Sequence, residues 1–234
     1  MLYRLLKAGV SVQREDIFRM QKENPREKLN ELIVPSNKFL LREIVDKAYL
    51  LVNKTSKDTV FISEQVGTKG LRSRMKTEAI KFLMKKYCDK GILPFYYEEK
   101  AVATGNHKYL LLYDKERKFH LTINQCRNLN KPAIPSGYRI RENQNFQSYF
   151  DFGSGEYKTM DVEDDSLYLE LNHGHQSEKP MFIGLGIPKN NNEWYGVVDL
   201  VRETPVLSRK FATSPTEIKG IDVETFKESI SNKG

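Results

Sequence analysis

The sequence predicts an α+β fold, with a helical N-terminal part, an antiparallel β-meander and a β-rich C-terminal part. Apolar residues recur at helical spacing within residues 1–53 and again within 71–87. Three short β-prone runs then follow at 92–102, 108–113 and 119–123, separated by turn residues. Further β-prone runs alternate with Gly-, Asn- and Asp-rich turns after the meander, which extends the β character to the C-terminal half.

The N-terminal part predicts two helices in succession. Asn24 is suited to cap the first, with Pro25 at its first position and Leu29 on its apolar face. Ser36 is suited to cap the second, and the polar run at 53–58 ends it. The apolar positions of this second helix are Phe39, Leu40, Ile44, Ala48 and Leu51.

A basic helix is predicted next, over about 71–87. The surrounding segment 69–90 carries eight basic and two acidic residues, a net charge of +6 out of +7 for the 234-residue chain. At 100° per residue, Arg74, Lys81 and Lys85 fall opposite an apolar stripe, and Gly91 is placed to end the helix. That apolar stripe consists of Leu71, Met75, Ala79, Phe82 and Leu83.

The helix and the hairpin after it resemble the reading helix and wing of a winged helix-turn-helix, over about 50 residues. The resemblance rests on the run KKYCDKGIL and on the turn at 104–106 between two strands. It implies that the helix enters the major groove while the hairpin touches phosphates or an adjacent groove. The residues expected to contact nucleic acid are Arg72, Arg74, Lys81, Lys85 and Lys108.

Composition agrees with an anionic partner. The pI is about 9.2, and 39% hydrophobic with 11% aromatic residues is enough for a packed core. Two cysteines, no long apolar run and no secretory signal predict a cytoplasmic protein without a membrane span. Abundant Lys and Asn are typical of an AT-rich genome, such as that of a low-GC bacterium, its phage or another mobile element.

The leading hypothesis is a nucleic-acid-binding protein, with DNA favoured, that acts as an accessory or regulatory factor without catalysis or a cofactor. Three to five phosphate contacts would give weak, nonspecific binding. One alternative is an inhibitor module whose basic face occludes an acidic protein site. The simplest alternative is that the basic face of the helix is exposed to solvent and binds no partner.

A nuclease is a further alternative, carried by Glu98 and Lys100. These alternate positions face the same side of a predicted strand, and Glu-x-Lys resembles the second half of the PD-(D/E)xK nuclease core. That resemblance implies Mg²⁺ bound by carboxylates, which requires a further Asp on a neighbouring strand. Asp89 lies roughly 30 Å away in an extended chain. An exposed charged strand is therefore the favoured interpretation.

A metal site is considered at Glu170, His173 and His175. A His-x-His pair can place both imidazoles on one ion, with Glu170 completing the set. Asn172 and Gly174 instead favour a turn at this point. The sequence therefore predicts a polar turn between two strands, and no metal.

The segment 128–137 contains two prolines and a glycine and is a candidate linker or long loop. It divides the chain into a helical plus winged-helix-like region, 1–127, and a β-rich region, 138–234, although both can belong to one domain. The elements expected in the second region are strands at 148–152, 166–171, 181–187 and 195–201, and a helix at 222–230.

Overall fold

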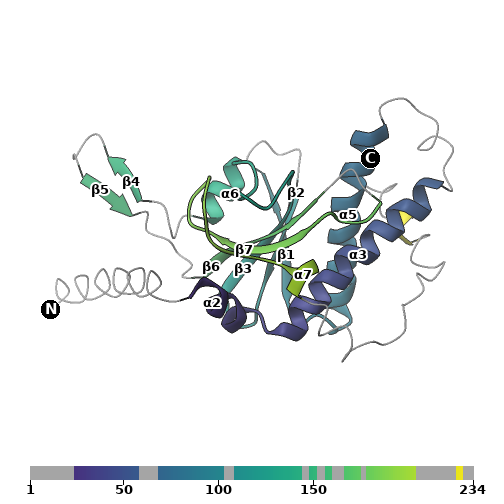
Figure 1. Ribbon diagram of the computed structural model, residues 1–234, viewed down its shortest axis with the longest axis horizontal. Coiled ribbons are helices and arrows are strands. Elements are labelled where there is room, and N and C mark those ends of the chain that lie inside the picture. The colour runs from purple at the N-terminus through teal and green to yellow at the C-terminus, as the bar shows by residue number, and fades with distance from the viewer. Residues whose placement is uncertain are drawn as a thin grey trace.

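A mixed α+β structure is seen in the computed structural model, which has helices in its N-terminal half and a six-stranded sheet (Figure 1). The long helices α3 (Pro35–Lys57) and α5 (Thr68–Asp89) lie together on one face of this sheet. The described residues are 24–57, 68–102, 108–143, 148–151, 156–159, 166–174, 178–203 and 225–228.

The six-stranded sheet has the order β1-β2-β3-β6-β7-β8. Only β3 and β6 run parallel among these neighbours, so the sheet consists of two antiparallel three-stranded halves joined at its centre. The bounds are β1 (Tyr96–Ala101), β2 (Lys108–Tyr113), β3 (Phe119–Gln125), β6 (Leu167–His173), β7 (Ile183–Pro188) and β8 (Trp194–Asp199).

The predicted β-meander is confirmed by β1, β2 and β3. The later strands β6, β7 and β8 also lie close to their predicted ranges. A separate two-stranded pair, β4 (Ser148–Asp151) with β5 (Glu156–Thr159), contains one strand that was not predicted. The sheet draws strands from both sides of the segment 128–137, because β3 pairs directly with β6.

The first helix, α2 (Pro25–Leu32), begins as its sequence predicts. The side chain of Asn24 accepts a hydrogen bond from the Arg26 amide at 3.0 Å, and Pro25 stands at the first helical position. The helix α3 begins at Pro35, one residue before the predicted cap Ser36, and continues through the polar residues to Lys57.

The end of α5 is set by Gly91. Its φ of +65° lies in the left-handed region that favours glycine. The Ile92 amide donates to the Tyr87 carbonyl at 2.9 Å, and the Gly91 amide donates to Cys88 at 2.8 Å. This pair of bonds is a Schellman motif, and it turns the chain directly into β1.

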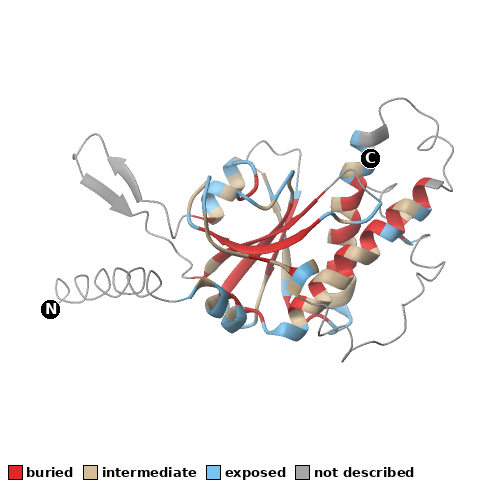
Figure 2. Ribbon diagram, in the orientation of Figure 1, coloured by how far each residue is buried: buried red, intermediate tan, exposed pale blue. Residues whose placement is uncertain are grey.

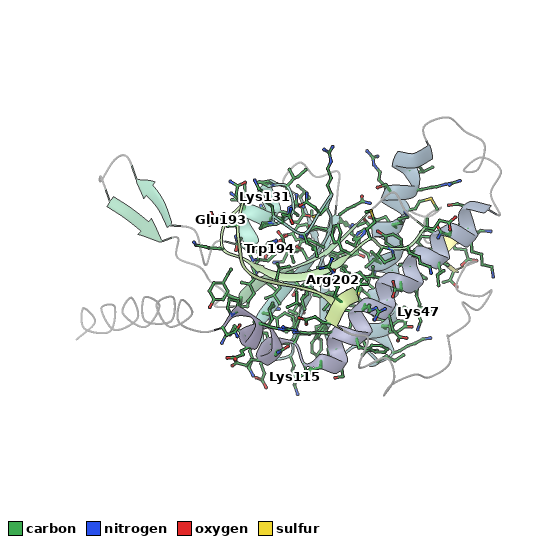
Figure 3. The ribbon with its side chains drawn as sticks, viewed as in Figure 1. Lys47, Lys115, Lys131, Glu193, Trp194 and Arg202 are labelled. Carbon is green, nitrogen blue, oxygen red and sulfur yellow. The ribbon has the colours of Figure 1, made fainter. Side chains whose placement is uncertain are left out.

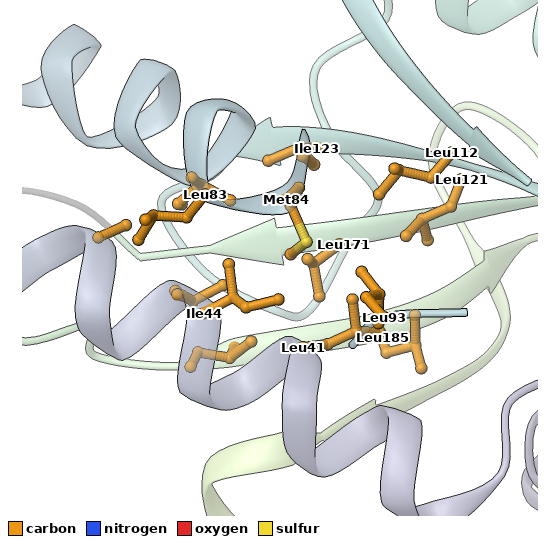
Figure 4. Close-up of a cluster of buried hydrophobic side chains, with 14 of the residues drawn as sticks. Leu41, Ile44, Leu83, Met84, Leu93, Leu112, Leu121, Ile123, Leu171 and Leu185 are labelled. Carbon is orange, nitrogen blue, oxygen red and sulfur yellow. The ribbon is translucent and has the colours of Figure 1, made fainter. Parts of the chain in front are cut away.

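The apolar core fills the space between the helices and one sheet face (Figure 4). Leu41 from α3 and Met84 from α5 lie over strand residues such as Leu171. Side chains alternate along a strand, so one row across the central strands faces the helices. That row consists of Ile123, Leu171, Leu185 and Val198.

The described residues after α5 also include three short helical segments. The short α6 (Gly137–Glu142) begins at the last residue of the expected linker 128–137 and was not predicted, and α7 (Leu200–Glu203) follows β8. Residues 225–228 are helical, and Phe226 packs against Phe82 of α5 with ring centroids 5.5 Å apart. Within the described ranges, no helix is long and apolar enough to cross a membrane.

The winged-helix arrangement is not confirmed. The strands β1 and β2 do form an antiparallel pair after the basic helix. However, β2 also pairs with β3, so the hairpin is the first third of a larger sheet rather than a separate wing. The turn residues 103–107, where the tip of the wing was predicted, lie outside the described residues.

Candidate nucleic-acid interface

The exposed surface of α5 is confined to its ends. From residue 70 to 74 the helix is mostly exposed, whereas every residue from 75 to 88 is buried or half-buried (Figure 2). The helix is covered by α3, by the sheet and by Phe226. A recognition helix needs a long free face to enter a major groove. The burial of α5 leaves Arg72 and Arg74 as its best-placed cations.

Two cations of the predicted stripe are held in ion pairs. Lys81 Nζ lies 2.8 Å from Glu78 Oε1, one turn earlier on the helix. Lys85 Nζ lies 2.6 Å from Glu99 Oε1 on β1, and it also sits over the Tyr97 ring at 5.6 Å. These carboxylates offset much of the positive charge that both lysines would offer to a phosphate.

The side chain of Lys76 points towards α3 rather than towards solvent. It is buried, and its Nζ lies 4.7 Å from the centroid of the Tyr49 ring on α3. Burial, and secondarily the Arg72 charge, lower the pKa of this lysine. The net charge of +6 on segment 69–90 therefore overstates the charge available to a partner.

Three of the predicted contact residues, Arg72, Arg74 and Lys108, lie at one end of the sheet. Gln125, the last residue of β3, donates from Nε2 to the Ser73 carbonyl at 3.4 Å, which ties the start of α5 to this end. The first residue of β2 and the chain just after β3 lie at the same end, because β2 and β3 are antiparallel. We call this set the cationic rim: Arg72, Arg74, Lys108 and Arg127.

Arg74, Lys108 and Arg127 of the cationic rim differ from Lys81 and Lys85 in their distance from carboxylates. Within the described part of the chain, no carboxylate lies within ion-pair distance of Arg74, Lys108 or Arg127, and all three are exposed. Arg127 was not predicted, because only the sheet topology brings it beside α5. In the sequence, Arg127 stands out only by its position just after a predicted strand, and that position alone does not indicate a binding site.

The nuclease candidates are engaged in separate ion pairs. Glu98 Oε1 lies 3.0 Å from Arg117, and Lys100 Nζ lies 3.7 Å from Glu142. Asp89 instead accepts a hydrogen bond from the Tyr97 hydroxyl at 2.9 Å, and Tyr97 points to the other face of β1. No group of three metal-ligating side chains that includes Glu98 is found among the described residues.

The metal candidates lie on opposite faces of β6. His173 faces the helices, where its Nδ1 lies 2.9 Å from the Tyr49 hydroxyl and its Nε2 lies 3.2 Å from Thr77 Oγ1. Glu170 faces the other side, and His175 lies outside the described residues. No group of three metal-ligating side chains is found in the described ranges.

The sheet face away from the helices is polar and yet buried. Tyr168, Glu170 and Asn172 of β6 lie beside Thr122 and Asn124 of β3. The Thr122 and Tyr168 hydroxyls are 2.7 Å apart, and Asn172 Nδ2 donates to Glu170 Oε2 at 2.9 Å. Such a network is tolerated because most of its polar groups have partners.

Residues 126–143 cover this polar face. The Ala133 amide donates to Glu170 Oε2 at 2.9 Å, and Arg139 Nη1 donates to Asn124 Oδ1 at 3.0 Å. Trp194 Nε1 donates to the Leu129 carbonyl at 2.8 Å and ties the cover to β8. Figure 3 labels Trp194 on β8 and Lys131 in the covering segment. The segment predicted as a linker is therefore a packed part of the fold.

Burial dominates the electrostatics beneath this cover. It raises the pKa of Glu170, which is 2% exposed, although hydrogen bonds from Ala133 and Asn172 oppose the shift. Burial and then the Glu170 charge raise the pKa of the nearby Cys126 thiol to about 12. Cys126 is thus protonated at neutral pH and is not suited to act as a nucleophile.

A pH series on Glu170→Gln should reveal this buried carboxyl. The raised pKa means that the folded state holds this proton more tightly than the unfolded state does. The free energy of unfolding of the natural protein, relative to Glu170→Gln, should therefore fall as pH rises above the ordinary value of 4.5, and level off above the folded-state pKa. Urea unfolding of both proteins from about pH 4 to about pH 8 measures the difference. Parallel curves for the two proteins would contradict the raised pKa.

The fold and surface define an α+β protein with a mixed six-stranded sheet, a polar face closed by a packed loop, and exposed cations at one sheet end. Comparison with protein-family models, curated proteins and solved structures gave no match for this chain. The arrangement of these residues is therefore the basis for the function proposed below.

Proposed function

We propose that the protein binds nucleic acid through the cationic rim and acts as an accessory or regulatory factor rather than as an enzyme. The single observation that carries this proposal is the convergence of exposed cations from α5, β2 and the end of β3. Lys81 and Lys85 have a smaller part in it than the sequence predicts, because Glu78 and Glu99 accompany them.

The expected binding mode is contact with phosphates. A cation placed on a phosphate releases condensed counterions, so affinity falls with salt by a slope of about −0.9 per contact on duplex DNA. Four rim cations would give a slope of roughly −3 to −4. Burial of the middle of α5 does not favour a major-groove reading helix, so nonspecific binding is expected.

The replacement of two rim cations tests the proposal. We expect Arg74→Gln/Lys108→Gln to reduce the magnitude of the salt slope by about 2 and to weaken binding about tenfold or more at low salt. The melting temperature should change little, since both side chains are exposed. Fluorescence anisotropy with labelled duplex and single-stranded oligonucleotides, titrated at several salt concentrations, measures both quantities.

Two matched variants serve as controls for net charge. Lys189→Gln/Arg202→Gln removes the same charge from exposed positions, each beside its own carboxylate, and should leave affinity nearly unchanged. Lys81→Gln/Lys85→Gln should give an intermediate effect. The absence of binding to any duplex or single strand at low salt would refute the proposal. Equal competition by polyglutamate would instead favour the acidic protein partner.

A further inference from the structure

A stack of three side chains stands at the other end of β1 from the cationic rim. The rings of Tyr96 and Tyr113 are stacked, with centroids 5.9 Å apart and an interplanar angle of 18°. The Arg117 guanidinium lies over the Tyr113 ring at 4.3 Å. Arg117 is in turn held by Glu98 at 3.0 Å, so the stack is ordered before any ligand arrives.

The stack is open at the edge of the sheet. Tyr96 is 50% exposed, and β1 is the outermost strand, with no strand paired to its outer side among the described residues. Ile92 nearby is 47% exposed, and Lys90 is exposed as well. A single half-exposed tyrosine is common on protein surfaces. A tyrosine stacked on a second ring, which itself packs against a cation, presents an ordered flat surface suited to a planar ligand.

A nucleobase is the planar ligand that matches this surface and the surrounding charge. Every base has a π-face, whereas the bases of a duplex are already stacked on one another, so only an unpaired base can add to the stack. Proteins that bind single strands combine such aromatic platforms with cations that follow the backbone. The net charge of +7 also attracts the negatively charged backbone of a nucleic acid.

The platform and Lys108 of the cationic rim lie at opposite ends of the β1–β2 pair, with Tyr96 on the sheet face away from α5. The strand β1 begins at Tyr96 and ends at Ala101, which is opposite Lys108. At about 3.3 Å per residue the two ends are roughly 17 Å apart. Binding sites of about 4 to 16 nucleotides are typical for single-strand binders and are long enough to reach both.

We infer that Tyr96 stacks an unpaired base, so that the nucleic acid bound at the cationic rim is single-stranded. This inference rests on the proposed function and adds the substrate class to it. The aromatic platform contributes the preference for single strands, while the rim contributes the sequence-independent attraction to phosphates.

The test compares ring removal with ring retention at Tyr96. We expect Tyr96→Leu to weaken binding of a labelled oligothymidylate about five- to 150-fold, the loss expected for one stacked base. Tyr96→Phe keeps the ring and should bind within about twofold of the natural protein. Neither variant should change affinity for a labelled blunt-ended duplex of two fully complementary strands, because all of its bases are paired. Anisotropy titrations measure both ligands.

Tyr97→Leu is the matched control, since it removes a ring from the same strand on the opposite face. It should leave oligothymidylate affinity nearly unchanged, with folding checked by circular dichroism for every variant. If the natural protein binds neither ligand, the proposed function itself fails. If it binds both but Tyr96→Leu matches the natural protein, the cationic rim stands and the stacking inference is overturned.

Discussion

Replacing His173 by leucine is expected to lower the free energy of unfolding by about 2–4 kcal/mol. His173 is 0% exposed and joins three elements, since its two ring nitrogens meet Tyr49 on α3 and Thr77 on α5. Leucine leaves both hydroxyls without this partner. Each buried group that loses its hydrogen bond costs about 1–3 kcal/mol, with less for the half-buried Thr77. Urea unfolding followed by circular dichroism measures the loss.

A double-mutant cycle with Tyr49→Phe separates hydrogen bonding from packing. Tyr49 is fully buried, so in His173→Leu its hydroxyl is left without the imidazole. Adding Tyr49→Phe should then recover part of the lost stability, because both polar partners are gone. Simple additivity of the two losses would contradict this account. A melting temperature of the natural protein that falls on addition of a chelator would restore the metal hypothesis for His173.

The second large effect is expected at Gly186, where alanine should cost about 2–3 kcal/mol. A Cβ placed there would lie 2.7 Å from the Trp194 ring and 2.9 Å from the Gly196 carbonyl oxygen. Neither group can move easily, because Trp194 is anchored to Leu129 through its indole nitrogen and the carbonyl belongs to β8. Thermal and urea unfolding of Gly186→Ala test this directly.

Gly184→Ala is the matched comparison on the same strand. Its Cβ would overlap the Cδ2 of Leu129, which is the far end of a flexible, half-buried side chain. A change of rotamer at Leu129 can relieve this overlap, so Gly184→Ala should cost less than Gly186→Ala. The reverse order would mean that Leu129 is held more firmly than Trp194.

The start of α2, the end of α5 and most strands were predictable because their signals are local. Asn24 and Pro25 mark a helix start, and Gly91 marks a helix end, through the conformations of the residues themselves. Alternation along 166–171 likewise predicts a strand with two faces. The polar turn predicted from Asn172 onward is wrong, because β6 continues to His173 and both residues are buried. The alternation does not say what covers each face, so the burial of Glu170 and Asn172 depends on a segment far away in the sequence.

The candidate site was predictable only in part, for the same reason. Glu78 lies three residues before Lys81, so that ion pair follows from helix geometry. The pairing of Lys85 with Glu99 requires knowing that β1 folds back along α5. Arg127 joins the cationic rim only because the sheet places the end of β3 beside the start of α5.

The parallel pairing of β3 with β6 also has a consequence for how the chain folds. Each antiparallel half is closed by connections between consecutive strands, whereas the central pair joins residues 48 positions apart, from Phe119 to Leu167. Closing that long loop costs conformational entropy before the hydrogen bonds between β3 and β6 can stabilise the sheet. High contact order of this kind slows folding, so the two halves should form early and their junction last.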